Sequence, residues 1–255
     1  MAHTSGRRLK KSATKSAVMV DGQQVQNKIL LALPTRECAT LFSKLKFVSL
    51  PVRTVLNQIG GPIEFGYFMN EGLGSVLSIM GDGKSVEVGL CGKEGFVGLP
   101  LIAGFSSSPT RVIVQVAGAA FRIGAKDLCT ALLQCPKLMT ALQRSTQELG
   151  LQSSQVAACN RLHEVDGRLA RSLLMSQDRL GGDALVPLTQ EFLAHMLGTR
   201  RASVTVAAGI LQKQGLITYK RGAVKVESRI GLEGATCECY GIMTEQIKKW
   251  QAETS

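Results

Sequence analysis

The stretch from about residue 47 to residue 123 consists of short apolar runs separated by glycine, a texture typical of β-strands. The segment SVEVGL at 85–90 alternates strictly, which predicts a strand whose valines and Leu90 share one face while Glu87 lies on the other. Short strands at this spacing are typical of a small barrel or roll with a lumen. The N-terminal domain is therefore predicted to be all-β.

After Pro136 the pattern changes to a helical one. The residues that follow a 4-3-4-3 spacing, the seam of a coiled coil, are Leu138, Leu142, Ser145, Leu149, Gln152, Val156 and Cys159. Residues 136–163 are therefore predicted to form one long helix that pairs with its copy in a homodimer. The alternative is a long helix that packs on its own β-domain.

The segment Leu188 to Ile217 reads LTQEFLAHMLGTRRASVTVAAGILQKQGLI and predicts two helices joined by a short turn. Thr189 is a suitable N-cap for the first helix, and Gly198 is expected to end it. Thr199 is expected to cap the second helix, 200–214. Two helices joined by about three residues that include glycine are typical of a helix-turn-helix.

The outward face of the 200–214 helix is unusually small and apolar, which suits a helix in a DNA major groove where methyl groups contact thymine. Arg200 and Arg201 stand at the positive end of the helix dipole, a position that a phosphate or base edge opposite them would explain. Residues 192–226 contain six cations and no carboxylate. The predicted DNA contacts are Thr189, Arg200, Arg201, Ala202, Ser203, Thr205, Val206, Lys213, Lys220 and Arg221.

The segment ITYKRGAVKVES that follows predicts a hairpin that turns near Arg221 and Gly222. With Lys220 and Arg221 at its tip, this hairpin would form a wing beside the helix-turn-helix. The alternative reading is a plain surface hairpin.

The charge of the chain supports a polyanionic partner. The 255 residues carry a net charge of +11, which favours either nucleic acid or an acidic membrane surface. No apolar run is long enough to predict a membrane span. The seven cysteines are dispersed and odd in number, which favours a reducing cytoplasm. Residues 1–26 are predicted to be a disordered basic tail.

The sequence predicts neither a catalytic nor a metal site. The three histidines show no triad or metal spacing, and the glycine-rich GKEGFVG lacks the order of a phosphate-binding loop. Cys237 and Cys239 form a Cys-x-Cys pair without a second pair nearby, so they are predicted to be inert thiols. An enzyme is the remote alternative, and a scaffold whose helix-turn-helix contacts protein is the nearer one.

Three segments together resemble the Crp/Fnr family of bacterial transcription regulators: the helix-turn-helix above, EVDGRLARSLL before it, and GSVLSIMGDGKSVEVGLCGKEGFVGLP in the β-rich part. The resemblance implies an α+β fold with an antiparallel β-roll of cyclic-nucleotide-binding type, a dimerisation helix and a winged helix-turn-helix. The corresponding ranges are 1–26 tail, 27–135 roll, 136–163 dimerisation helix, 164–240 DNA-binding domain and 241–255 tail. It also implies a homodimer on a pseudo-palindromic operator of double-stranded DNA, with RNA polymerase as a further partner of an activator.

The predicted effector pocket departs from that of cAMP-responsive relatives. Gly98 and Arg111 match the family's glycine and arginine, but Leu99 replaces a glutamate and Val112 a hydroxyl residue, so neither can make the expected hydrogen bond. This argues against cAMP and leaves the effector, with Glu87 as a further pocket residue, unidentified. At base-reading positions of catabolite-activator-like relatives this chain has Ala202 and Val206, so its operator should differ. An Fnr-type iron-sulfur cluster is not expected, since only Cys38 lies near the N-terminus.

Overall fold

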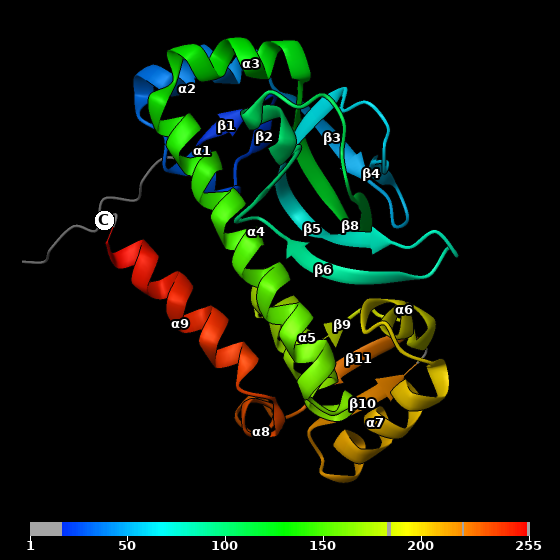
Figure 1. Ribbon diagram of the computed structural model, residues 1–255. Coiled ribbons are helices and arrows are strands. Elements are labelled where there is room, and N and C mark those ends of the chain that lie inside the picture. The colour runs from blue at the N-terminus through cyan, green and yellow to red at the C-terminus, as the bar shows by residue number, and fades with distance from the viewer. Residues whose placement is uncertain (1–16, 183–184, 221, 254–255) are drawn as a thin grey trace, which may run out of the picture.

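The computed structural model describes residues 17–182, 185–220 and 222–253. A β-roll with short helices forms one end of the molecule, and the winged-helix domain lies at the other (Figure 1). One long helix, α4, runs between them. The predicted α+β fold, an antiparallel β-domain followed by helices and a C-terminal helix-turn-helix, is confirmed.

The roll is built on one six-stranded antiparallel sheet, in which β3, β8, β5 and β6 lie in that order. The other two of its six strands are short: β4 pairs with β8, and β7 pairs with β5. The strands of this part are β1 (Met19–Val20), β2 (Gln23–Gln24), β3 (Lys46–Leu50), β4 (Val55–Asn57), β5 (Phe65–Ile79), β6 (Ser85–Cys91), β7 (Phe96–Val97) and β8 (Arg111–Gly124).

Strands β5 and β8 bend where their register shifts repeatedly between Met69 and Gly74. Gly72 adopts a φ of 78°, and a Cβ there would come within 2.5 Å of the Val116 carbonyl oxygen. A Cβ at Gly118 would overlap the backbone of Glu71. The two glycines therefore let the backbones approach closely at a bulge, and bulges of this kind bend a sheet into a roll.

Short helices cap the roll, so the expectation of an all-β domain was incomplete. They are α1 (Lys28–Leu31), α2 (Thr35–Phe42), the 3-10 helix η1 (Leu99–Ala103) and α3 (Ala125–Gln134). The periodicity of α2 and α3 is clear only over one or two turns, which is short for a sequence signal. Their apolar sides pack with Phe68, Phe121 and the first turns of α4 into one core.

Helix α4 (Pro136–Leu162) ends within one residue of the predicted range. It begins with proline, whose missing N–H is not needed in the first turn. The buried carboxylate of Glu37 accepts hydrogen bonds from the backbone nitrogens of Lys137 and Leu138, at 3.1 and 2.9 Å. This side chain satisfies free donors at the positive end of the helix dipole and so fixes where α4 starts.

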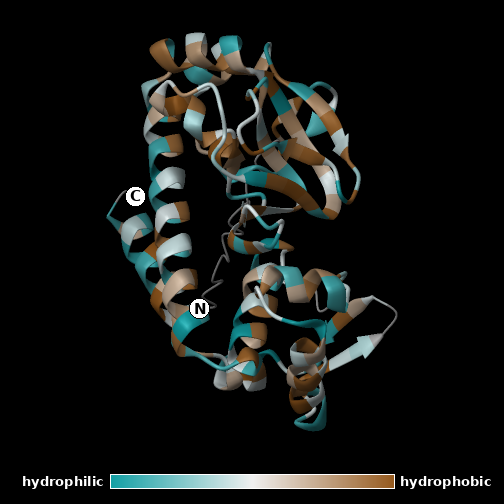
Figure 2. Ribbon diagram, turned by 45° about the vertical axis from the view of Figure 1, so that its right-hand side comes forward, coloured by the Kyte–Doolittle hydropathy of each residue, from teal (hydrophilic) through white to brown (hydrophobic). Residues whose placement is uncertain are grey.

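Most of the predicted seam of α4 faces inward: Leu138, Leu142, Gln152 and Val156 are buried in this chain and cannot contact a second copy, whereas Ser145 and Leu149 are half-buried. Leu138 and Leu142 are fully buried in the core of the roll. The Gln152 side chain accepts a hydrogen bond from the Leu90 nitrogen at 3.1 Å, and Val156 is buried. The same spacing serves any helix with a single apolar stripe, and here that stripe packs on the helix's own chain. Figure 2 shows hydrophilic and hydrophobic positions mixed along the length of α4.

The winged-helix domain comprises α5 (Val165–Arg179), β9 (Leu185–Val186), α6 (Gln190–Met196), α7 (Arg201–Lys213), β10 (Ile217–Lys220), β11 (Ala223–Val226) and α8 (Arg229–Ala235). Its core joins Leu173 of α5, Leu193 of α6 and Leu211 of α7, all fully or almost fully buried. Strand β9 pairs with β11 and widens the predicted hairpin to three strands.

The structure corrects the predicted tail at each end of the chain. Residues 241–255 were expected to be a tail, but α9 (Cys239–Ala252) is a helix that packs on α4 and buries Met243 (Figure 1). Near the N-terminus, β1 and β2 pair as a hairpin inside the range predicted to be disordered. The basic cluster at residues 7–15 lies outside the described residues. Of the helices in the described part of the chain, none has the length and apolar character that a membrane crossing requires.

Candidate nucleic-acid interface and sensory cavity

The two helices of the helix-turn-helix begin and end at residues with clear local roles. The Thr189 hydroxyl accepts a hydrogen bond from the Phe192 nitrogen at 3.1 Å, which confirms the predicted N-cap. Gly198 has a φ of 57° and lies against the side chain of Val86 in the roll. Thr199 was predicted to cap α7, but Arg200 holds that position in extended conformation, without a capping side chain.

Helix α7 separates a buried face from an exposed one as the sequence predicts. Val204, Ala208 and Leu211 are buried, together with Ala207. On the other side Ala202, Thr205 and Lys213 are exposed, Val206 is 65% exposed, and Ser203 and Gly209 are half-buried. Arg200 and Arg201 extend this face at its N-terminal end and are also exposed. Val206 and Ile210, the latter 39% exposed, place two apolar side chains one helical turn apart on the open side of α7.

The wing turns where the sequence predicts. Strands β10 and β11 pair antiparallel from Ile217 opposite Val226 to Lys220 opposite Ala223, and Gly222 in the turn has a φ of 83°. Lys225 forms an ion pair with Glu227 at 2.7 Å. Lys220 ends β10, and Arg221 lies outside the described residues.

A small cavity lies between the roll and α4, where the sequence places an effector. Its volume is about 70 Å³, and Gly98, Leu99 and Val112 line it as predicted. Leu149 of α4 also lines it, and packs so closely that a Cβ at Gly89 would overlap its side chain. At this volume the cavity has room for a few waters, whereas a nucleotide needs several hundred Å³.

Two predicted pocket residues lie elsewhere. Arg111 is not part of the cavity lining, and its Nε donates a hydrogen bond to Gln58 at 2.9 Å near the surface. Glu87 is buried against α5, accepts a hydrogen bond from Ser75, and has its pKa raised to about 8 by burial. That desolvation outweighs the attraction of Arg171 and Arg179.

A register shift between β5 and β6 explains why Glu87 was misplaced. The pairing slips between Val76 and Leu77, which interrupts the alternation of β6. Gly89 consequently faces Leu149 of α4, whereas Leu90 packs with Met175 of α5. Because α4 covers one face of β6 and the winged-helix domain covers the other, both faces are buried and the alternation does not show which one borders the cavity.

The charge of the cavity disfavours an anion. Glu94 and Glu148 both line it. Burial, followed by the nearby charge of Glu94, raises the pKa of Glu148. Arg179 forms an ion pair with Glu94 at 2.9 Å, and the charges of Arg179 and Lys28 offset part of the rise in the pKa of Glu148, but neither cation lines the cavity. A cyclic phosphate would therefore meet two carboxylates here.

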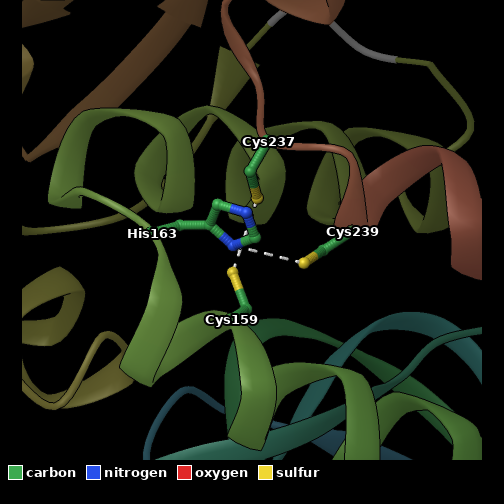
Figure 3. A group of neighbouring side chains, drawn as sticks. All are labelled: Cys159, His163, Cys237 and Cys239. Atoms are coloured by element: carbon green, nitrogen blue, oxygen red, sulfur yellow. Dashed lines mark hydrogen bonds between the residues drawn. The ribbon is translucent and has the colours of Figure 1, made fainter.

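Sequence reasoning missed one group of side chains. Cys159 and His163, at the end of α4, come together with Cys237 and Cys239 (Figure 3). The expectation of inert thiols rested on the lack of a second pair, which the fold supplies from 78 residues away. The available signal was the spacing of Cys159 and His163, since residues four apart share one helix face.

Comparison with known proteins agrees with this architecture. Residues 167–235 match the model of the Crp-like helix-turn-helix domain. No curated protein matches the chain. Among solved structures, FixK2 from Bradyrhizobium japonicum shows 15% identity and a TM-score of 0.65 over 76% of this chain and 98% of its own.

Two further structures have the same fold. The c-di-GMP-responsive global regulator CLP from Xanthomonas campestris shows 17% identity and a TM-score of 0.63, over 76% of this chain and 100% of its own. A Crp/Fnr-family transcriptional regulator from Thermus thermophilus shows 21% identity and a TM-score of 0.53, over 74% and 97%. The chain therefore has the Crp/Fnr regulator fold with a Crp-like helix-turn-helix domain, and the resemblance seen in the sequence is confirmed. These matches indicate no enzymatic family.

Proposed function

We propose that the chain is a sequence-specific, DNA-binding transcription regulator that reads a pseudo-palindromic operator as a homodimer through α7. The observation that carries this proposal is the exposed face of α7, which is small and apolar and is bounded by Arg200 and Arg201. A DNA major groove suits such a face, because thymine methyl groups lie on the floor of the groove and phosphates line its edges.

The residues of this face divide into two roles. Ala202, Thr205 and Val206 present methyl groups for contact with thymine, and Arg201 reaches a guanine edge or a phosphate. Lys220, at the wing, neutralises phosphate without reading sequence. The alternative, a helix-turn-helix that contacts protein, predicts no steep dependence of DNA binding on salt.

Homodimerisation would use the outward side of α4, because most of the predicted seam is buried in its own chain. Gly150, Ser154 and Ala157 are exposed and small, which allows a second helix to approach closely. Beside them an apolar groove of about 1080 Å³ runs between α4 and the roll, with Phe105 64% exposed on its rim. A partner helix would cover this groove. The two-fold axis then sets the two copies of α7 about 34 Å apart, in successive major grooves.

The kind of effector that this regulator would bind is inferred from the small cavity between the roll and α4. The volume and the two carboxyl groups of this small cavity disfavour a cyclic nucleotide inside it, so an effector bound there would be small and neutral or cationic. Closure of the roll on Leu149 would be the step that such a ligand alters.

The experiment is selection from a randomised duplex pool of about 30 base pairs by the purified full-length protein, read by sequencing. We expect a two-fold symmetric motif. Arg201→Ala should weaken binding to that motif by about 1 to 3 kcal/mol relative to random DNA. The matched control is Arg36→Ala, an exposed arginine on α2 with the same change in charge. Absence of any enriched motif, or equal loss in both variants, would overturn the proposal.

A further inference from the structure

Four potential metal ligands converge where α4 ends and α9 begins. Cys159 and His163 come from the last turn of α4 and the residue after it, whereas Cys237 lies between α8 and α9 and Cys239 is the first residue of α9 (Figure 3). The donor atoms of all four lie within 4.8 Å of one another. Cys159 Sγ and Cys237 Sγ are 3.4 Å apart, and Cys239 Sγ is 3.5 Å from His163 Nδ1.

These distances fit a single tetrahedral ion. Zn²⁺ with bonds of about 2.3 Å to sulfur and 2.0 Å to nitrogen holds its ligand atoms roughly 3.5 to 3.8 Å apart. The four donors therefore need only small movements to surround one ion. A cluster of several irons requires a wider arrangement, because each ligand then binds a different iron atom.

The groups around these four side chains are placed like the residues that hydrogen-bond to the ligands of a zinc site. The Nε2 atom of His163, which Nδ1 ligation leaves free, lies 3.9 Å from a carboxylate oxygen of Glu238. Gln155 donates a hydrogen bond to Cys239 Sγ at 3.2 Å. Metal-binding histidines usually present their second nitrogen to a carboxylate, which fixes the tautomer and the orientation of the ring.

Two buried arginines supply an independent observation. Arg171 is 3% exposed, and its Nε and Nη1 atoms find no hydrogen-bond partner in the described part of the chain. Arg168 is 7% exposed and leaves its Nε similarly unsatisfied. Arg168 and Arg171 both act electrostatically on the thiol of Cys159, and Arg171 also acts on that of Cys237.

Charge balance connects these arginines to the four ligands. A buried cation without a counter-charge is costly. Three thiolates and one Zn²⁺ carry a net charge of −1, which would offset one of the two guanidinium groups. Neutral thiols would supply no negative charge from the four ligands to offset either guanidinium group.

We propose that Cys159, His163, Cys237 and Cys239 bind one Zn²⁺ in a closed structural site that joins the end of α4 to the start of α9. As the three Zn–S bonds form, three thiol protons pass to solvent. All four positions are filled by protein, so no coordination position remains for a substrate, as in structural rather than catalytic zinc sites. The site stands apart from the cavity and from α7.

The test measures metal content of the full-length protein by mass spectrometry after expression in zinc-supplemented medium. We expect about one zinc per chain in the wild type and a loss of at least about tenfold in Cys237→Ser. Cys129→Ser, an exposed cysteine on α3, is the matched control and should retain the metal. Wild-type protein with zinc below about 0.1 per chain, or Cys237→Ser with unchanged zinc, would overturn the proposal.

A second measurement keeps the test decisive where Cys237→Ser fails to fold. Co²⁺ added to metal-free wild-type protein should produce the absorption of tetrahedral cobalt with thiolate-to-metal charge transfer. A chelator should lower the thermal midpoint of the wild type, because metal binding contributes to folding. An octahedral cobalt spectrum, bound iron in place of zinc, or a midpoint unchanged by chelator would each contradict a structural zinc site.

Discussion

Substitution of Glu87 tests whether a buried carboxyl group between the two domains is neutral. Glu87 lies in β6, accepts a hydrogen bond from Ser75 and faces Arg171 and Arg179 of α5. Burial raises its pKa from 4.5 to about 8. Glutamine keeps the size of the side chain and its ability to hydrogen-bond, but cannot ionise. Glu87→Gln therefore removes the titration with little change in packing.

The magnitude follows from proton linkage. A pKa raised in the folded state means that the folded protein holds a proton that the unfolded chain releases. The stability from this group is complete below about pH 4.5 and is lost as the pH rises towards 8. The full difference is about 4 to 5 kcal/mol as an upper bound, and about 2 kcal/mol of it falls between pH 6 and pH 8.

The assay is urea unfolding of both proteins, followed by far-ultraviolet circular dichroism from pH 5 to pH 9. Other titrating groups contribute equally to both, so the difference between the two curves isolates Glu87. We expect the variant to gain about 2 kcal/mol relative to the wild type from pH 6 to pH 8. Parallel curves would refute the reasoning, since they would mean that Glu87 is already ionised and paired with an arginine of α5.

Three other substitutions test the interface, the dimer and the roll. Lys220→Ala should weaken binding to specific and random duplexes alike, and it should reduce the slope of log affinity against log salt concentration by about one. Fluorescence anisotropy measures both effects. A loss of affinity confined to the specific duplex would contradict a phosphate-binding role. Ala157→Arg should convert dimers to monomers, as measured by light scattering, whereas the control Ala39→Arg, at another exposed alanine, should not. An unchanged mass for Ala157→Arg would exclude the outward face of α4 as the dimer contact. Gly118→Ala should lower the free energy of unfolding by about 1 to 3 kcal/mol, since its Cβ would overlap the Glu71 backbone; equal stability in urea unfolding would contradict that close approach.

The helix-turn-helix could be predicted from sequence because its determinants are local. Thr189 caps its own helix, Gly198 supplies the left-handed conformation of the turn, and the apolar residues of α7 follow one face. Each signal lies within about four residues of the position that it determines. The length of α4, 27 residues, was predictable for the same reason, since proline begins it and its apolar periodicity continues from Leu138 to Cys159.

The parts that the sequence did not predict depend on contacts between distant segments. The seam of α4 shows an apolar stripe, but only the fold shows that the roll of the same chain covers it. The register shift of β6 is set by its pairing with β5, so Glu87 could not be assigned to a side. Cys159 and Cys237 are 78 residues apart, and nothing in linear spacing brings them together.

The winged-helix domain is held at two adjoining points. The chain enters the domain just after His163 and leaves it at Cys237, beside Cys159, so both connections meet at the same end of α4. A domain attached by a single linker can swing about it in any direction. Here α9 also packs on α4, and α6 contacts β6 of the roll, so we expect a rotation of α7 relative to the roll to displace α4 and α9 as well. A shift of α4 and a change in the orientation of α7 are therefore expected to occur together.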